Sequence, residues 1–419
     1  MTQISAAWVK DERLQALLVA LGEGDDEARV VGGAVRNTLM DRPVTDIDIA
    51  TTTRPEETIR RAEAIGLKTV PTGIAHGTVT VVSDGRPYEV TTLRRDIETD
   101  GRHAVVTFGR DWQADAERRD FTINALYADR EGRVLDLVGG LADLERGMLR
   151  FIGDAEQRIL EDRLRILRFF RFFAWYGRGR PDADGLRAAT RLKDGLTKLS
   201  AERVWNEMRK LLAAPDPSRA LLWMRQTGAL TVALPESERW GIDDIHALVE
   251  TERVRGWAPD ALLRLMAIVP PDPARLSALS QRLKLANHER DRLLAFANEP
   301  EPDPDESDRM LKARLFLGNR QASEDRLRLA LAKAQGKVAG DPAALETVAK
   351  LTARLATVNT FTAPSFPLKG EDLLAKGFRS GPVLGKEIDR LKQIWVKSGF
   401  TLGREDLLAA STSPETQGD

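Results

Sequence analysis

Two aspartates one residue apart, Asp46 and Asp48, lie in the segment VVGGAVRNTLMDRPVTDIDIATT at positions 30–52. On a strand, side chains alternate between the two faces, so both carboxylates are expected on one face while Ile47 and Ile49 face the core. Two close carboxylates repel each other unless a cation lies between them. Mg²⁺ suits such a pair, because it takes one or two carboxylates and completes its shell with water and substrate phosphates. An isolated Asp-x-Asp more often marks the polar face of an ordinary strand than a metal site.

The residues before the aspartates favour the metal interpretation. Gly32 and Gly33 end a short apolar run and open a predicted helix, whose free backbone N–H groups attract phosphate, and Arg36 adds a charged donor one turn later. Gly-Gly alone would indicate only a tight strand-to-helix turn. Together with the aspartate pair, it predicts a site for a triphosphate beside a metal ion.

A second constellation lies in RILEDRLRILRFFRF, where Asp162, Arg165 and Arg168 are spaced by three along a predicted helix that continues from residue 161. An i,i+3 salt-bridge ladder would give the same spacing. Cytosine and adenine, however, each offer an amino donor beside a ring-nitrogen acceptor, whereas guanine and uracil offer the reverse. A carboxylate and a guanidinium side by side would therefore accept C and A and oppose G and U.

The elements that must position these residues change character along the chain. Residues 28–137 alternate short β-rich runs with helices predicted over 34–40 and 55–65, whereas helical periodicity dominates after residue 158. An apolar stripe is expected there from Leu160, Leu164, Leu167 and Phe170. Proline-rich breaks are predicted at 297–308 and 361–370. The pattern indicates an α+β protein with a mixed α/β head and a helical remainder.

Composition sets further limits. The chain has 419 residues, 42% hydrophobic and 30% charged, with a net charge of -1, which fits a folded protein of several domains. There is no cysteine, so disulfides and thiolate metal sites are excluded and a reducing, cytoplasmic setting is expected. The N-terminal segment predicts an amphipathic helix rather than a signal peptide, and no apolar run is long enough to span a membrane.

Five ordered motifs carry a family resemblance over nearly the whole chain. GGAVRN through DIDIATT resembles the first motif of the bacterial class II tRNA nucleotidyltransferases, the CCA-adding enzymes, and of the related bacterial poly(A) polymerases. AERRDFTINALYAD, LDLVGGLADLERGMLRFIGD, RILEDRLRILRFFRF and ERVWNEMRKLL are similar to the motifs that follow, and LKGEDLLAKGFRSGPVLGKEI is similar to the family's tail. The segment 93–108 resembles the flexible loop that relatives specific for the two C additions lack.

The resemblance implies a polymerase-β-like nucleotidyltransferase head at 1–137, a hinge and neck at 138–212, a helical body at 213–300 and a tRNA-binding helical tail at 301–419. It implies Mg²⁺ as cofactor, held by Asp46 and Asp48. Glu89 is a candidate third carboxylate from its place in the predicted strand YEVTTLR, although an alternating strand also puts some acid on a face by chance. The nucleotide-binding residues that it implies are Gly32, Gly33, Arg36 and Arg119 for the triphosphate, Asp120 and Asn124 for the ribose, Asp162 and Arg165 for the base, and Arg168 and Arg171 in support.

Two positions depart from the family pattern. Asn37 stands where Asp is usual, and Asp136-Leu137 stands where Asp-Pro is frequent. An amide keeps the shape and the acceptor oxygen of Asp but loses its charge, so a weaker pairing with Arg36 is expected. Neither departure removes a predicted metal ligand.

RNA contacts are expected around the neck, from Arg158, Arg163, Arg171, Arg178 and Arg180. The interleaved aromatic residues are interpreted mostly as core, with stacking on RNA retained for Trp175 and Tyr176. The predicted function is addition of C, C and A to tRNA from CTP and ATP, with no nucleic-acid template and no membrane partner. The alternatives are a poly(A) polymerase, an A-only-adding enzyme and a catalytically silent RNA-binding relative.

Overall fold

The computed structural model describes residues 2–100, 103–237, 241 and 244–412, with the side chains of 95–106 excepted. The chain divides into two compact units, Met1–Glu238 and Arg239–Asp419. The four-part division expected from the sequence therefore stays a prediction.

The first unit begins with a head built on one mixed sheet. Seven described strands lie in the order β3-β4-β5-β2-β1-β8-β9, and every neighbouring pair is antiparallel except β2 and β5, which run parallel. The strands are β1 Ala28–Val31, β2 Asp48–Thr51, β3 Lys68–Gly73, β4 Thr78–Ser83, β5 Arg86–Thr92, β8 Leu126–Ala128 and β9 Val134–Asp136. The alternating and mixed α/β pattern of the sequence is confirmed.

A separate hairpin, β6 Arg94–Asp100 and β7 His103–Phe108, occupies most of the segment expected to be a flexible loop. Residues 101 and 102 of that segment lie outside the described residues. The backbone of the rest pairs as two antiparallel strands.

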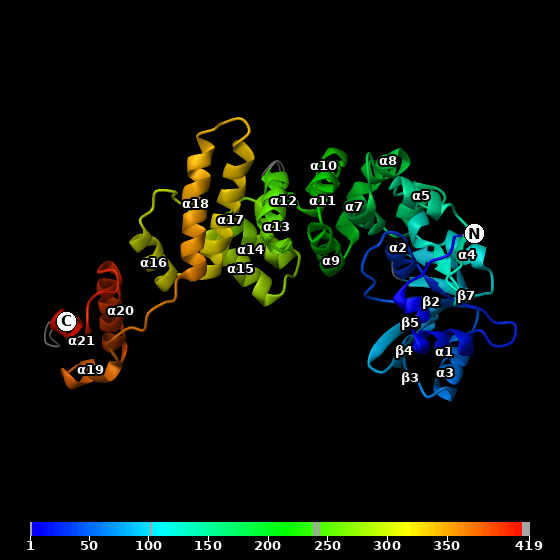
Figure 1. Ribbon diagram of the computed structural model, residues 1–419, viewed down its shortest axis with the longest axis horizontal. Helices are drawn as coiled ribbons and strands as arrows, with labels where there is room; N and C mark the ends of the chain where they lie inside the picture. The colour runs from blue at the N-terminus through cyan, green and yellow to red at the C-terminus, as the bar shows by residue number, and fades with distance from the viewer. Residues whose placement is uncertain (1, 101–102, 238–240, 242–243, 413–419) are drawn as a thin grey trace. The chain divides into compact units, whose positions relative to one another are not determined.

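Helices α1 Glu12–Leu21 and α3 Pro55–Ala64 lie together beside the sheet (Figure 1). The apolar face of α1 is buried, as the amphipathic pattern predicted, and Asp11 caps its N-terminus by accepting from the backbone N–H groups of Arg13 and Leu14. The short helices α2 Gly33–Leu39 and α4 Trp112–Glu117 complete the head. Both predicted helices of this region are confirmed within one residue at each end.

The rest of the first unit is helical. Phe169, Phe170, Phe172 and Phe173 of α7 are buried, and Phe169 stacks on Phe151, with ring centroids 5.5 Å apart. The interpretation of these rings as core is therefore confirmed. The helices are α5 Gly140–Arg146, α6 Ala155–Glu161, α7 Arg165–Tyr176, α8 Ala183–Leu192, α9 Ala201–Leu212, α10 Ser218–Thr227 and α11 Ala229–Ala233.

Two expectations for this region are wrong. The helix predicted from residue 161 begins only at Arg165, because α6 ends at Glu161 and Asp162 adopts an extended backbone with φ −149° and ψ 108°. The Asp162 carboxylate then accepts from the backbone N–H of Leu164 at 3.0 Å, which stabilises the turn before α7. Leu160 is 47% exposed and does not join the apolar stripe, since the break gives α6 and α7 separate helical phases.

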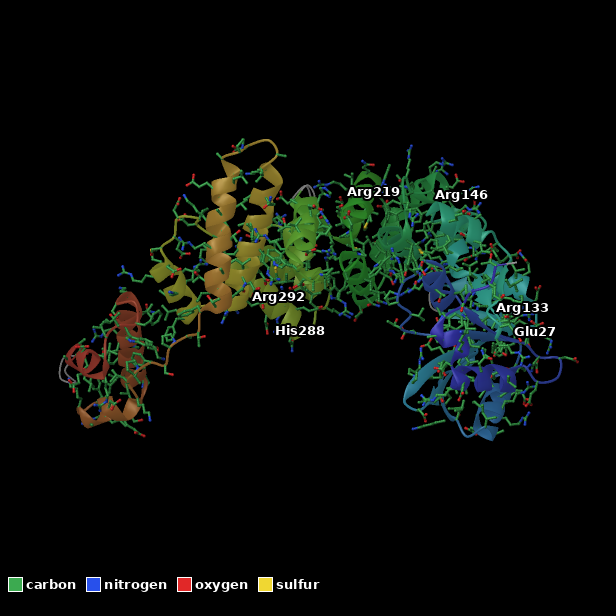
Figure 2. The ribbon with its side chains drawn as sticks, in the orientation of Figure 1. Glu27, Arg133, Arg146, Arg219, His288 and Arg292 are labelled. Atoms are coloured by element: carbon green, nitrogen blue, oxygen red, sulfur yellow. The ribbon has the colours of Figure 1, made fainter. Side chains whose placement is uncertain are left out.

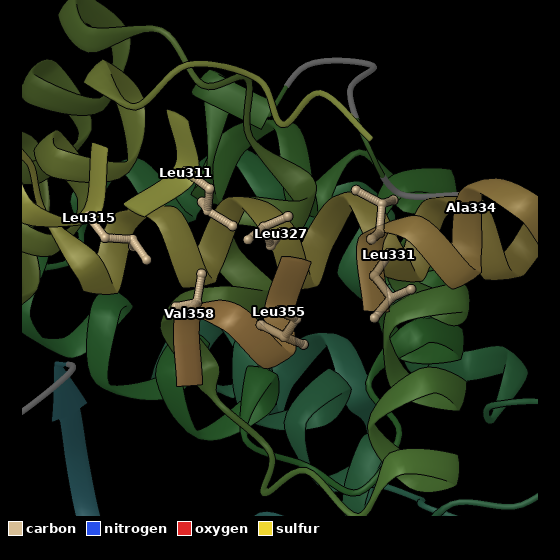
Figure 3. Close-up of a cluster of buried hydrophobic side chains, with 8 residues drawn as sticks. Leu311, Leu315, Leu327, Leu331, Ala334, Leu355 and Val358 are labelled. Carbon is tan, nitrogen blue, oxygen red and sulfur yellow. The ribbon is translucent and has the colours of Figure 1, made fainter. Parts of the chain in front are cut away.

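In the second unit, every regular element that the structure describes is a helix. Leucines from α16, α17 and α18 form a buried cluster with Val358 and Ala334 (Figure 3), and α17 and α18 lie side by side (Figure 1). The helices are α12 Asp244–Arg255, α13 Ala261–Ile268, α14 Pro273–Arg282, α15 Asn287–Asn298, α16 Asp308–Leu317, α17 Arg320–Lys337, α18 Ala344–Thr360, α19 Gly370–Ala375, α20 Pro382–Lys397 and α21 Arg404–Ala409.

Both proline-rich breaks are confirmed. The chain leaves α15 at Asn298 and enters α16 at Asp308, and it leaves α18 at Thr360 and enters α19 at Gly370. Beyond the second break, α19 to α21 pack around Trp395 and Leu391, and Phe316 of α16 packs against the same cluster. Within the described residues, no helix is both long and apolar enough to cross a membrane.

Candidate active site

A cavity of about 810 Å³ in the first unit gathers nearly all of the predicted site residues. It lies between the head and the helices that follow the head. Its charged and polar walls come from Gly32, Gly33, Arg36, Asn37, Asp46, Asp48, Arg118, Arg119, Asp120, Asn124, Asp162, Arg165, Arg168, Arg171 and Arg203. The aromatic part of the wall comes from Phe172, Trp175 and Tyr176.

The aspartate pair lies at the start of β2. Asp46 and Asp48 are exposed to the cavity, whereas Ile47 and Ile49 are buried, so the expected alternation of side chains is confirmed. Only Asp48 belongs to the strand, however, and Asp46 lies two residues before it, so the expectation that both stand on a strand is wrong.

Negative charge is concentrated around Asp48. Partial burial, with the charges of Glu89 and Asp46, raises the pKa of the Asp48 carboxyl, while Arg119 acts in the opposite direction. Glu89 lies opposite Asp48 in the parallel pairing of β2 and β5, but it does not line the cavity. A bound cation would relieve this repulsion, so the donor set fits a divalent metal.

A divalent metal at this site would have two protein carboxylates as ligands rather than a full set of protein ligands. In the part of the chain that the structure describes, no group of three or more acidic or histidine side chains is arranged to hold a metal ion. Such a site needs water and substrate oxygens to complete the shell, as is usual for Mg²⁺. Glu89 as a third ligand stays a prediction.

The glycine turn brings backbone close to the cavity. Gly32 has φ +70°, in the left-handed region, and a Cβ there would lie 3.3 Å from the carbonyl oxygen of Asn124. The turn joins β1 to α2, and Gly33 is the first residue of that helix. Both requirements, an unusual φ and a close approach, favour glycine at position 32.

Arg36 is more deeply embedded than the sequence indicated. Its side chain is 6% exposed, and its guanidinium lies over the ring of Tyr176 at 4.0 Å from the centroid. It donates to the Tyr176 hydroxyl at 2.8 Å and to the side-chain oxygens of Asn37 and Asn124. Burial lowers the pKa of this guanidinium. Arg36 therefore joins α2 to α7 as well as lining the cavity, and its predicted role in triphosphate binding stays a prediction.

Both the oxygen and the nitrogen of the Asn37 side-chain amide form hydrogen bonds. Its oxygen accepts from Arg36 and from the Tyr176 hydroxyl, and its nitrogen donates to the carbonyl oxygen of Pro43 at 2.9 Å. A carboxylate could not make the bond to Pro43. Asn37 therefore links Arg36 to the segment that leads to Asp46, which the reasoning from charge alone did not anticipate.

Asn37→Ala should lower the free energy of unfolding of the first unit by about 1–3 kcal/mol, because it leaves polar partners of a half-buried amide unsatisfied. Urea unfolding followed by circular dichroism measures this, with the two units' transitions analysed separately. Asn298→Ala is the matched control, since its amide is exposed and donates to the carbonyl oxygen of Leu294 within one helix. An Asn37→Ala transition that coincides with wild type would contradict the linking role.

Asp120 and Asn124 lie together on the cavity wall. Asn124 donates to Asp120 at 3.0 Å, and Arg168 donates to the other Asp120 oxygen through Nε at 2.8 Å. Burial opposes ionisation, yet the Arg168 charge and the Asn124 hydrogen bond hold the pKa of Asp120 at about 2. Asp120 is therefore a carboxylate at neutral pH, able to accept from a hydroxyl group.

Asp162 and Arg165 both reach the cavity wall from the turn and the helix after α6. Each has another protein partner: Asp162 pairs with Arg203 of α9 at 2.7 Å, and Arg165 pairs with Glu161. The ladder alternative, in which Asp162 pairs with Arg165 along one helix, is therefore not what the structure contains. The two side chains share a cavity while neither neutralises the other.

Arg168 and Arg171 are also held by acids. Arg168 pairs with Asp120, and Arg171 pairs with Glu207 of α9, with Nε and Oε2 2.7 Å apart. Trp175 and Tyr176 are partly exposed at the same wall, and the Trp175 indole donates to the carbonyl oxygen of Lys210. The stacking role of these two rings is not tested by the structure.

Sequence reasoning did not single out Arg203, Arg118 or Lys210 as site residues, although all three line the cavity. Arg203 and Lys210 lie in the neck motif ERVWNEMRKLL, whose spacing places Arg203 and Glu207 one helical turn apart. That spacing was the available signal. The ion-pair partners of Arg203 and Glu207 depend on how α9 packs on α7.

Two family models match parts of the chain: the poly A polymerase head domain over residues 28–150, and the probable RNA and SrmB-binding site of polymerase A over residues 181–240. CCA tRNA nucleotidyltransferase 1, mitochondrial, of Danio rerio is 33% identical over 395 residues, which cover 91% of this chain and 86% of that protein. The human protein of the same name is 32% identical over 95% of this chain and 89% of its own length. This chain belongs to the CCA tRNA nucleotidyltransferase family. The sequence-based assignment to it is confirmed.

Solved structures agree with this membership. The CCA-adding enzyme of Bacillus stearothermophilus in complex with CTP is 28% identical and covers 94% of both chains, with a TM-score of 0.67. The Thermotoga maritima CCA-adding enzyme complexed with tRNA matches with a TM-score of 0.62 at 19% identity, which supports the fold. The predicted fold class, a mixed α/β head followed by helices, is therefore confirmed as that of CCA tRNA nucleotidyltransferases.

Proposed function

We propose that this protein adds C, C and A in turn to the 3′ end of tRNA, using CTP and ATP, Mg²⁺ and no nucleic-acid template. In each addition the terminal 3′-hydroxyl oxygen bonds to the α-phosphorus, the α–β bridging P–O bond breaks, and pyrophosphate leaves. The observation that carries the proposal is the single cavity that holds an aspartate pair, a glycine turn, several arginines and the Asp162 and Arg165 side chains.

The head residues support the transfer step by position and charge. Asp46 and Asp48 would hold Mg²⁺, which supplies a Lewis acid for the phosphate oxygens and the attacking hydroxyl. Arg119 on the same wall would neutralise phosphate charge, and Gly32 and Gly33 would let backbone N–H groups approach it. Asp120 and Asn124 offer an acceptor and an amide for the ribose hydroxyls.

Base selection would come from Asp162 and Arg165. A carboxylate that accepts from the exocyclic amino group and a guanidinium that donates to the ring nitrogen together match cytosine and adenine. In the structure these groups pair with Arg203 and Glu161, so a base edge must replace or share those contacts. Selection by fixed side chains needs no template strand.

The tRNA would be held by positive charge outside the cavity. Arg178 and Arg180 are exposed after α7, and Arg146 on α5 and Arg219 on α10 are among the charged side chains of the same unit (Figure 2). Phosphate contacts of this kind carry affinity without sequence information. A neck at 138–212, a body at 213–300 and a tRNA-binding tail at 301–419 remain part of this proposal, as does a cytoplasmic setting.

The test is to incubate the protein with tRNA that ends at its unpaired discriminator base and to read product length. Labelled CTP and ATP are supplied singly and together, with and without Mg²⁺. We expect two additions with CTP alone, three with both nucleotides, and none without a divalent metal. The relatives that span nearly the whole chain are named CCA tRNA nucleotidyltransferases, which favours this outcome over the long A tract of a poly(A) polymerase.

A further inference from the structure

Asp115 is a buried acid with no part in the proposed reaction. It lies in α4, its side chain is 1% exposed, and it does not line the cavity. Its carboxylate nevertheless contacts two arginines that do, Arg118 and Arg119. A buried charge of this kind is costly unless its partners satisfy it fully.

Each carboxylate oxygen of Asp115 accepts hydrogen bonds from a different arginine. Oδ1 accepts from Nε and Nη2 of Arg118, at 2.8 and 2.6 Å. Oδ2 accepts from Nε and Nη2 of Arg119, at 3.1 and 3.0 Å, and from the hydroxyl of Tyr127 at 2.8 Å. The Tyr127 oxygen in turn accepts from Nε of Arg119 at 3.2 Å. Each guanidinium is therefore fixed along the same edge.

The opposite end of each guanidinium is left for another partner. Within the described residues, Nη1 of neither arginine donates a hydrogen bond, and the Arg118 and Arg119 side chains are only 15% and 19% exposed. Burial disfavours the carboxylate, but the two arginines lower the pKa of Asp115, so it stays ionised. One negative charge against two positive charges leaves the cluster with a net charge of about +1.

We propose that Asp115 is a positioning residue, which fixes Arg118 and Arg119 so that their Nη1 ends together bind the polyphosphate of the incoming nucleotide. This rests on the proposed function and adds Arg118 to the phosphate-binding residues. The carboxylate acts through the arginines and does not contact the nucleotide. Arg118 and Arg119 line the same cavity as the aspartates that would hold the metal, so the positive cluster and the metal site face one bound nucleotide.

A purely structural role for Asp115 predicts something different. Loss of a buried ion pair would weaken the fold and with it the binding of every ligand, whatever the number of phosphates. A positioning role predicts that only ligands with β- and γ-phosphates bind less well. Comparing CTP with CMP separates the two, because they share base, ribose and α-phosphate.

The experiment uses Asp115→Asn in the full chain, with dissociation constants for CTP and CMP measured by equilibrium dialysis. We expect CTP to bind about tenfold more weakly and CMP to change by less than about twofold. The neutral amide keeps only one acceptor oxygen, so one arginine loses both of its hydrogen bonds and the other keeps its two bonds to an uncharged group. Equal weakening of CTP and CMP, or unchanged CTP binding, would overturn the proposal. Asp325→Asn is the matched control, as Asp325 is 0% exposed and accepts two hydrogen bonds from Arg292 at 2.8 Å in the second unit.

Tyr127→Phe covers the case in which Asp115→Asn does not fold. It removes one hydroxyl from the cluster while the carboxylate and both arginines remain, so a smaller loss of about two- to threefold is expected for CTP alone. If Asp115→Asn does not fold, and Tyr127→Phe binds both CTP and CMP as tightly as wild type does, the proposal is also overturned. Wild-type tRNA extension is measured beside it: a wild type that binds CTP but adds nothing contradicts the proposed function instead.

Discussion

Asp46→Ala and Asp48→Ala should each reduce nucleotide addition by a factor on the order of 10³ or more, because several kcal/mol of charge stabilisation depends on the metal that these residues would hold. Binding of tRNA should change little, since it depends on basic side chains elsewhere. The measurements are single-turnover CTP addition to tRNA at saturating enzyme, and tRNA affinity by filter binding.

Asp84→Ala is the matched control for this pair. Asp84 is an exposed aspartate of the same head, paired with Arg13 at 2.8 Å on the turn between β4 and β5, and its loss should leave addition within about twofold because exposed pairs contribute little. Substantial Mg²⁺-dependent addition by a folded Asp48→Ala protein would contradict the assignment of the two aspartates as metal ligands.

Asp162→Ala should weaken discrimination between CTP and UTP by about 1–3 kcal/mol, or roughly 5- to 150-fold in the ratio of kcat/KM. The carboxylate opposes the carbonyl that uracil presents where cytosine has an amino group, and alanine removes that opposition. The ratio is measured on one tRNA for wild type and variant, beside a thermal melting curve.

The structure adds a necessary control to this experiment. Asp162 also accepts from the backbone N–H of Leu164 and pairs with Arg203, so its loss will lower stability as well. Asp154→Ala removes a similar backbone contact, because Asp154 caps α6 by accepting from Gln157 at 2.7 Å, but it does not line the cavity. An unchanged CTP-to-UTP ratio in active Asp162→Ala would assign Asp162 to the turn alone.

Periodicity predicted what depends on local burial. The alternation around Asp46 and Asp48 and the α1 amphipathic face follow from side-chain spacing, and the structure contains them. Both proline-rich breaks follow from proline, which cannot continue a helix. The break at Asp162 does not follow from spacing, because residues 155–176 keep helical periodicity on both sides of it. A side-chain contact to Leu164 competes with the helix there, and such competition is not visible in an apolar pattern.

The candidate site likewise divides into features that the sequence predicted and features that it did not. Residue types and a family resemblance collected most of the cavity wall, from residues 32–48, 119–124 and 162–171, but not Arg118, Arg203 or Lys210. The partners of those residues were not predictable: Arg36 stacks on Tyr176, and Asp162 pairs with Arg203, through contacts 140 and 41 residues apart in sequence. These pairings depend on helix packing, which one sequence does not specify.

The burial of the tyrosines gives the cavity a built-in chemical marker. Tyr88 and Tyr127 are fully buried, and Tyr176, the third of the chain's three tyrosines, is partly exposed on the cavity wall beside Arg36. A reagent that nitrates phenol rings in the folded protein would therefore meet Tyr176 first. The absorbance of a nitrotyrosine at this position would follow the entry of nucleotide or RNA in real time, with no label introduced by mutation.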